Sequence, residues 1–258
     1  MDYNLLAQDN KFHDWAKLEP VATDYTKYAE TDPSIIAAAH KIVDVYSAFA
    51  SAKQSFRSAG YENYGDLCGD DEISKLYTKT HFLVDAVIEY AICLDLSWQV
   101  IWAYIQPASF EYLCKNEYKK MEKECDRDNL LAQLDCAIAQ KNLKAERIKN
   151  ILVDFDNNEN VTNLRTLYNS RKHRGTIHFV GLGENDKTMA NGVYILSREE
   201  YTVEAVENIL LTYHQNFQPY FNALIAEIIP VDYMNKKVSF IDHVNTILKM
   251  GAIQNKEN

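Results

Sequence analysis

The chain has 258 residues, a formal net charge of −10 at pH 7 and 47% hydrophobic residues, so it is not a disordered polypeptide. Glycine (8) and proline (5) are scarce, which disfavours β-sandwiches and doubly wound folds because both need many turns. The acidic balance argues against a broad surface for nucleic acid but leaves room for a local phosphate site.

The first residues carry acidic groups and no apolar core of signal-peptide length. No stretch approaches the roughly 18 consecutive apolar residues of a membrane span, so we expect a cytoplasmic protein without a membrane partner. The odd number of widely spaced cysteines favours free thiols over disulfides or a zinc site; they are Cys68, Cys93, Cys114, Cys125 and Cys136.

The first half of the chain predicts long helices. Residues 1–30 are interpreted as an N-terminal arm with room for one short helix. Asp32 and Pro33 are suited to begin a helix that Gly60 ends. A second helix is expected over residues 72–105, and because it is apolar nearly all round, it should be central and buried. Its main apolar stripe comprises Leu83, Val87, Tyr90, Leu94, Trp98, Ile101 and Ile105.

Shorter elements follow. A polar helix is expected over residues 110–123, one long helix over 130–155, and another over 162–172 after a break where an asparagine or threonine can serve as N-cap. Residues 176–197 are β-branched, aromatic and turn-rich, which predicts two short strands joined by a long loop.

Helices resume over residues 202–229, with a kink expected at Pro219, and over 239–249. The predicted fold class is therefore all-α, an antiparallel helical bundle with a small β-hairpin insertion near residues 176–197. Residues 31–258 are predicted to form one domain.

A cationic cluster stands out in this acidic chain. Residues 171–179 read RKHRGTIHF and contain Arg171, Lys172, His173, Arg174 and His178. Arginine carries a permanent charge and forked donors that suit phosphate oxygens, and histidine can exchange a proton near neutral pH. One arginine and one histidine beside a phosphodiester are the minimum set for RNA cleavage without a metal: the imidazole removes the 2′-hydroxyl proton and the guanidinium offsets charge on the phosphate.

The same cluster has a purely structural interpretation. Cations gather at helix C-termini, where they complement the helix dipole and bond free carbonyls, and Gly175 is suited to cap such an end. The sequence physics leaves both interpretations open.

The stretch LRTLYNSRKHRGTIH resembles the motif region of the HEPN family, whose members are all-α bundles with an R-x(4–6)-H motif near a late helix. Arg171, six intervening residues and His178 match the long form of that motif. The resemblance implies a ribonuclease-like site at a homodimer interface, where both protomers contribute their arginine and histidine. Many members serve in toxin–antitoxin, phage-defence or RNA-processing systems, while others are scaffolds or nucleotide binders.

Three hypotheses follow. The first is a metal-independent endoribonuclease acting on single-stranded RNA, without a cofactor or metal, in which Arg171 and His178 are catalytic. The residues expected to bind its substrate are Tyr168, Asn169, Lys172, His173 and Arg174. The second is a catalytically degenerate scaffold that binds a protein partner, such as an antitoxin. The third is a bundle whose cationic corner holds the phosphate of a nucleotide.

Overall fold

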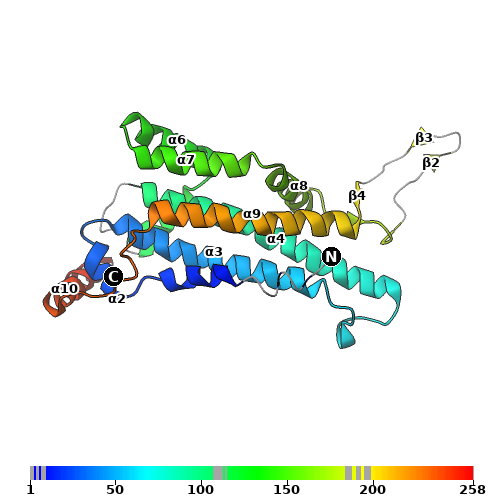
Figure 1. Ribbon diagram of the computed structural model, residues 1–258, viewed down its shortest axis with the longest axis horizontal. Helices are drawn as coiled ribbons and strands as arrows, with labels where there is room; N and C mark the ends of the chain where they lie inside the picture. Colours follow the sequence, from blue (N-terminus) through cyan, green and yellow to red (C-terminus); the bar gives the residue numbers. More distant parts are fainter. Residues whose placement is uncertain are drawn as a thin grey trace. The chain divides into compact units, whose positions relative to one another are not determined.

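The computed structural model describes residues 3, 6, 10–106, 113, 115–183, 188–189, 193–194 and 199–257, and the fold is all-α (Figure 1). The helices are η1 (Lys11–Leu18), α2 (Ala22–Tyr28), α3 (Pro33–Ser58), η2 (Gly65–Leu67), α4 (Glu72–Ile105), α5 (Lys115–Lys123), α6 (Arg127–Ala139), α7 (Leu143–Asp156), α8 (Glu159–His173), α9 (Val203–Ile228) and α10 (Phe240–Glu257). The strands are β1 (His178–Phe179), β2 (Thr188–Met189), β3 (Val193–Tyr194) and β4 (Glu200–Tyr201).

The chain forms two compact units, each built from three separate segments. Unit 1 comprises residues Met1–Asn10, Ala48–Ile92 and Asp156–Phe217, and unit 2 comprises Lys11–Ser47, Cys93–Phe155 and Gln218–Asn258. Helices α3, α4 and α9 contribute residues to both units. The predicted cationic cluster lies in unit 1.

The core of unit 1 is aromatic, and its contacts give the helix directions. The rings of Phe49 on α3 and Tyr90 on α4 lie 5.6 Å apart, and the Tyr90 hydroxyl lies 2.7 Å from Nδ1 of the buried His214 on α9. Towards the other end of the unit, Lys79 of α4 forms an ion pair of 2.8 Å with Glu207 of α9. Helices α4 and α9 therefore run in the same direction within this unit, so the predicted antiparallel arrangement does not hold for this pair.

Tyr3 orients α3 in the same unit. Its ring lies 5.7 Å from the ring of Phe56 and 5.7 Å from Nζ of Lys79. Because Phe56 is near Lys79 while Phe49 is near Tyr90, α3 runs antiparallel to α4, as expected for neighbouring helices of an antiparallel bundle.

Unit 2 has a separate aromatic core. The rings of Phe155 and Tyr220 stack at 3.9 Å, and Trp15 meets Phe221 edge to face at 4.8 Å. Trp15 belongs to η1 and is buried, so the segment predicted as an N-terminal arm supplies core residues to this unit.

The two long helices predicted in the first half of the chain are confirmed. Helix α3 begins at Pro33 and ends two residues before Gly60, and α4 has the predicted bounds. Every predicted stripe residue of α4 except Ile105 is buried. Helix α9 continues through Pro219, and α10 extends beyond its predicted end. The predicted polar helix is present as α5; most of residues 107–114 lie outside the described residues.

The prediction of one helix over residues 130–155 is wrong, because the structure has two helices, α6 and α7. Lys141, between them, has a positive φ of 66°, which interrupts the right-handed helix. Asn142 then caps α7, since its Oδ1 accepts from the backbone N–H groups of Lys144 and Ala145, both at 3.1 Å.

The predicted pairing of the insertion is also wrong in part. The first predicted strand, β1, pairs in parallel with β4 and not with the predicted strand near Val193. A short antiparallel pair does occur, between β2 and β3, but both of its strands lie inside the segment 188–194. Period and composition identified extended backbone here, but they do not specify which extended segments meet.

Helices α3 and α4 are long and apolar enough, by length and composition, to cross a membrane. Of the most apolar window in each, 61% and 67% is buried within the protein. Core helices of soluble proteins have the same properties, so this feature does not distinguish between the two environments.

Candidate functional site

Helix α8 carries the basic cluster at its last turn. Asn158 is its N-cap, as the sequence allowed, and its side chain accepts from the backbone N–H of Asn160 at 2.9 Å. The buried residues of α8 are Val161, Leu164 and Leu167. Since that apolar face is used for packing, the basic residues of the last turn are left exposed.

The end of α8 fixes Arg171. Gly175 has a φ of 123°, a backbone conformation that residues with a Cβ rarely adopt. Nη1 of Arg171 donates to the carbonyl oxygen of Gly175 at 2.8 Å. Arg171 therefore does satisfy a carbonyl beyond the helix end, as the structural interpretation of the cluster predicted.

Strand β1 fixes His178. It pairs with β4 so that His178 lies opposite Glu200, and the N–H of Val180 donates to the carbonyl oxygen of Tyr201 at 3.1 Å. Ile177 and Phe179 are buried, whereas His178 is only half-buried. The alternation of a strand thus anchors both neighbours and leaves the imidazole accessible.

Arg171 and His178 line one cleft of about 700 Å³ within unit 1. Helix α4 forms one wall, and the end of α8 with the segment that follows it forms the other. The lining residues are Ile73, Tyr77, Thr80, His81, Val84, Asp85, Arg171, Thr176, Ile177, His178, Phe179, Gly181, Leu182 and Gly183. The two predicted catalytic residues are therefore brought to one solvent-accessible hollow.

His178 also borders a second, smaller hollow of about 220 Å³, which it shares with Arg174. Tyr201 lines this hollow too, and burial, followed by a hydrogen bond to Glu199, raises the pKa of its hydroxyl. Of the predicted substrate-binding residues, Arg174 is thus the one that adjoins His178.

The other four predicted substrate-binding residues line neither hollow. Nζ of Lys172 lies over the half-buried ring of Tyr168, 5.7 Å from its centroid. Asn169 and His173 are exposed on α8. The structure therefore does not gather the whole predicted set into one place.

Sequence reasoning missed the contribution of α4. His81 and Asp85 lie one turn apart, with Nε2 of His81 3.6 Å from Oδ2 of Asp85, and both line the cleft with Arg171 and His178. Tyr77 lies a further turn back and is 65% exposed. The available signal was the spacing of four residues between Tyr77, His81 and Asp85, which places them on one face of a helix.

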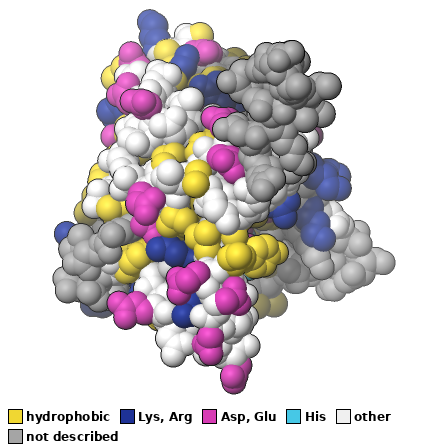
Figure 2. All heavy atoms as spheres, turned by 90° about the vertical axis from the view of Figure 1, so that its right-hand side faces the viewer, with side chains coloured by type: hydrophobic (Ala, Val, Ile, Leu, Met, Phe, Trp, Pro, Cys, Tyr) yellow, Lys and Arg dark blue, Asp and Glu magenta, His cyan; other side chains and the backbone are white. Residues whose placement is uncertain are grey.

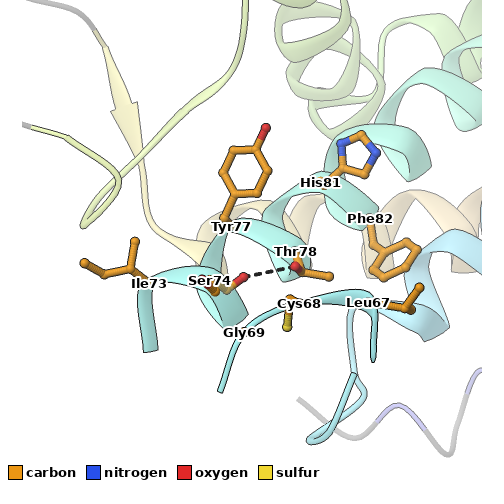
Figure 3. A pocket seen from close by; sticks show the side chains of 9 residues that line it. All are labelled: Leu67, Cys68, Gly69, Ile73, Ser74, Tyr77, Thr78, His81 and Phe82. Carbon is orange, nitrogen blue, oxygen red and sulfur yellow. Dashed lines mark hydrogen bonds between the residues drawn. The ribbon is translucent and has the colours of Figure 1, made fainter. Parts of the chain in front are cut away.

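A neighbouring hollow of about 550 Å³ lies along the same stretch of α4 (Figure 3). It shares Ile73, Tyr77 and His81 with the cleft, and Figure 3 shows Tyr77 and His81 projecting from one side of the helix. On the face of the molecule in Figure 2, lysine and arginine side chains are interspersed with acidic and hydrophobic ones, and several of them lie at the right-hand edge.

Among the described residues, no group of three or more histidine, cysteine, aspartate or glutamate side chains is arranged to hold a metal ion. Comparison of the chain with protein-family models, with curated proteins and with solved structures gives no match. The resemblance to the HEPN family accordingly rests on the arginine–histidine motif and the all-α fold.

Proposed function

We propose that this protein is a metal-independent endoribonuclease acting on single-stranded RNA, with Arg171 and His178 as its catalytic residues. The observation that carries the proposal is that both side chains line one accessible cleft, although they belong to different secondary-structure elements. A helix end and a short strand hold them there.

The chemistry suits the two groups. The imidazole of His178 takes the proton of a ribose 2′-hydroxyl, and that oxygen attacks the adjacent phosphorus. The guanidinium of Arg171 donates to the phosphate oxygens, where negative charge grows in the transition state. Nη1 of Arg171 donates to the carbonyl oxygen of Gly175. Because a guanidinium has five N–H donors, others remain for a phosphate.

The bond to Gly175 supports catalysis as well as structure. It restricts the rotamers of Arg171 before substrate arrives, so less side-chain entropy is lost on binding. Arg174, beside the second hollow, is suited to hold the next phosphate of the strand. The homodimer and the role in phage defence or a toxin–antitoxin pair are parts of the proposal that the HEPN resemblance alone supports.

The test is cleavage of an unstructured RNA oligonucleotide by the purified chain in excess chelator, with analysis of the product ends. We expect 2′,3′-cyclic phosphate and 5′-hydroxyl ends, and a loss of about 100-fold or more in His178→Ala and Arg171→Ala. His13→Ala, which changes an exposed histidine of unit 2, is the matched control and should keep full activity. Activity that survives His178→Ala would refute the assignment.

A second candidate, a non-catalytic module that binds a protein partner, is favoured by the bond from Arg171 to Gly175. In that case Arg171 would serve only the helix end. An intact wild-type protein that neither cleaves nor binds RNA, yet binds its partner with little dependence on salt, would establish this candidate instead.

A further inference from the structure

The cleft contains a second imidazole besides that of His178, contributed by α4. The side chain of His81 is 65% exposed, and it lies on the wall opposite the segment that carries His178. The two walls are close together, because a Cβ atom on Gly181 would lie 3.2 Å from Cδ2 of Leu76 on α4. His81, Arg171 and His178 all belong to unit 1.

Cleavage of a phosphodiester by its own 2′-hydroxyl involves two proton transfers at different atoms. The attacking 2′-oxygen loses a proton on one side of phosphorus, and the departing 5′-oxygen gains one on the other side. One imidazole cannot reach both oxygens in a single in-line step, so a second acid–base group is needed. The proposed function leaves that second role unfilled.

We propose that His81 is the general acid of this cleft and that Asp85 positions it. The inference rests on the proposed ribonuclease function and adds a residue outside the arginine–histidine motif. The carboxylate of Asp85 lies 3.6 Å from Nε2 of His81, where it can orient the ring and offset the charge of an imidazolium. His178 lines the same cleft from the opposite wall, which leaves it the role of the base.

The step balances without another reactant. His178 accepts the 2′-hydroxyl proton as the bond from O2′ to phosphorus forms. The bond from phosphorus to O5′ breaks, and the protonated His81 gives its proton to O5′. The products are a 2′,3′-cyclic phosphate and a 5′-hydroxyl. Proton exchange with water then deprotonates His178 and protonates His81, which restores the starting state.

The decisive probe is an RNA in which a bridging sulfur replaces the 5′-oxygen at one linkage, because a thiolate leaves without being protonated. On ordinary RNA we expect His81→Gln to lower the cleavage rate about 100-fold. On the sulfur-bridged RNA, His81→Gln should cleave at nearly the wild-type rate, whereas His178→Gln should stay impaired on both substrates. His13→Gln is the control for a histidine change elsewhere.

The pH dependence gives a second readout. The other titratable or charged groups lining the cleft are Arg171 on α8, His178 on β1, and Tyr77 and Asp85 on α4. Arg174, Glu199 and Tyr201 border His178 in the second hollow, and Glu200 lies opposite it on β4. Wild-type cleavage should follow a bell-shaped profile; His81→Gln should lose the alkaline limb and His178→Gln the acidic limb. Asp85→Asn should lower the rate on ordinary RNA about 10-fold, keep both limbs and be rescued by the sulfur bridge.

The outcomes separate the two proposals. Full activity of His81→Gln on ordinary RNA, or an equal loss on both substrates, overturns the general-acid role while leaving the ribonuclease standing. Wild-type protein that cleaves neither RNA overturns both.

Discussion

The backbone of Gly181 passes so close to Leu76 of α4 that a Cβ atom on Gly181 would lie 3.2 Å from Cδ2 of that leucine. Gly181 also has a φ of 92°, which disfavours any residue with a Cβ. This close approach places the segment that carries His178 beside α4 at the cleft. It makes Gly181 a sensitive position for both stability and activity.

Gly181→Ala should lower the free energy of unfolding by about 1–2 kcal/mol, because the new methyl group meets Leu76 and the positive φ is strained. Cleavage should fall as well, since the wall that carries His178 must move. Gly251→Ala is the control: Gly251 lies in α10 with open space around it, and the change should stabilise by up to about 1 kcal/mol. Denaturant unfolding measures both; an unaffected Gly181→Ala would contradict the close packing.

Arg171→Lys should separate charge from geometry. Lysine keeps the positive charge but lacks the planar guanidinium, which can donate to the carbonyl oxygen of Gly175 and to a phosphate at the same time. We expect kcat to fall about 100-fold, the effect of losing one transition-state donor, with RNA affinity at low salt largely kept. Arg174→Lys, at the second hollow, should instead change KM more than kcat. Equal kinetics of Arg171→Lys and wild type would show that charge alone suffices.

The sequence predicted elements well where one face of a long helix is buried, as in α3 and α4, because a period of 3.6 over many turns is hard to produce otherwise. The prediction of one helix over residues 130–155 failed at Lys141, because a single residue with positive φ separates two helices and no glycine or proline marks the break in the sequence. The site divides similarly. Arg171 and His178 are visible as a local motif, but His81 lies some ninety residues upstream, and only the packing of α4 beside them adds it to the cleft.

The break between α6 and α7 gives a paired stability prediction. Lys141→Gly should stabilise by about 1 kcal/mol, because glycine adopts the left-handed conformation of this exposed residue without the cost of a Cβ. Asn142→Ala should destabilise by about 1 kcal/mol, since two backbone N–H groups lose their acceptor. Thermal unfolding of both variants is the measurement, and a destabilised Lys141→Gly would mean that the break has another cause.

Replacement of Lys79 should destabilise unit 1, because it leaves a buried carboxylate without its cation. Glu207 is 4% exposed, and its Oε1 accepts from the Tyr3 hydroxyl and pairs with Nζ of Lys79 at 2.8 Å. Lys79→Met leaves the Glu207 carboxylate without its cation, and we expect the free energy of unfolding to fall by about 3 kcal/mol. The double variant Lys79→Met with Glu207→Leu should recover much of the loss. A single variant as stable as wild type would contradict the pairing.

Glu89 continues the row of α4 that begins with His81 and Asp85, and its pKa is raised, first by burial and then by the charge of Asp85. The folded state therefore binds this proton more tightly than the unfolded chain does. The stabilising contribution of the protonated carboxyl is complete below the ordinary value of 4.5 and is lost as the pH rises through the raised pKa. At neutral pH the ionised carboxylate of Glu89 thus destabilises the folded state.

Glu89→Gln should consequently raise the melting temperature at pH 7, and the gain should vanish in acid below the ordinary carboxyl range. Asp85→Asn removes the neighbouring charge, so in that background the gain from Glu89→Gln should be smaller. Thermal melts of the four proteins across this pH range provide the measurement. Two results would contradict this account of Glu89. One is a Glu89→Gln variant that melts below wild type at neutral pH; the other is a gain in melting temperature from Glu89→Gln that persists unchanged in acid.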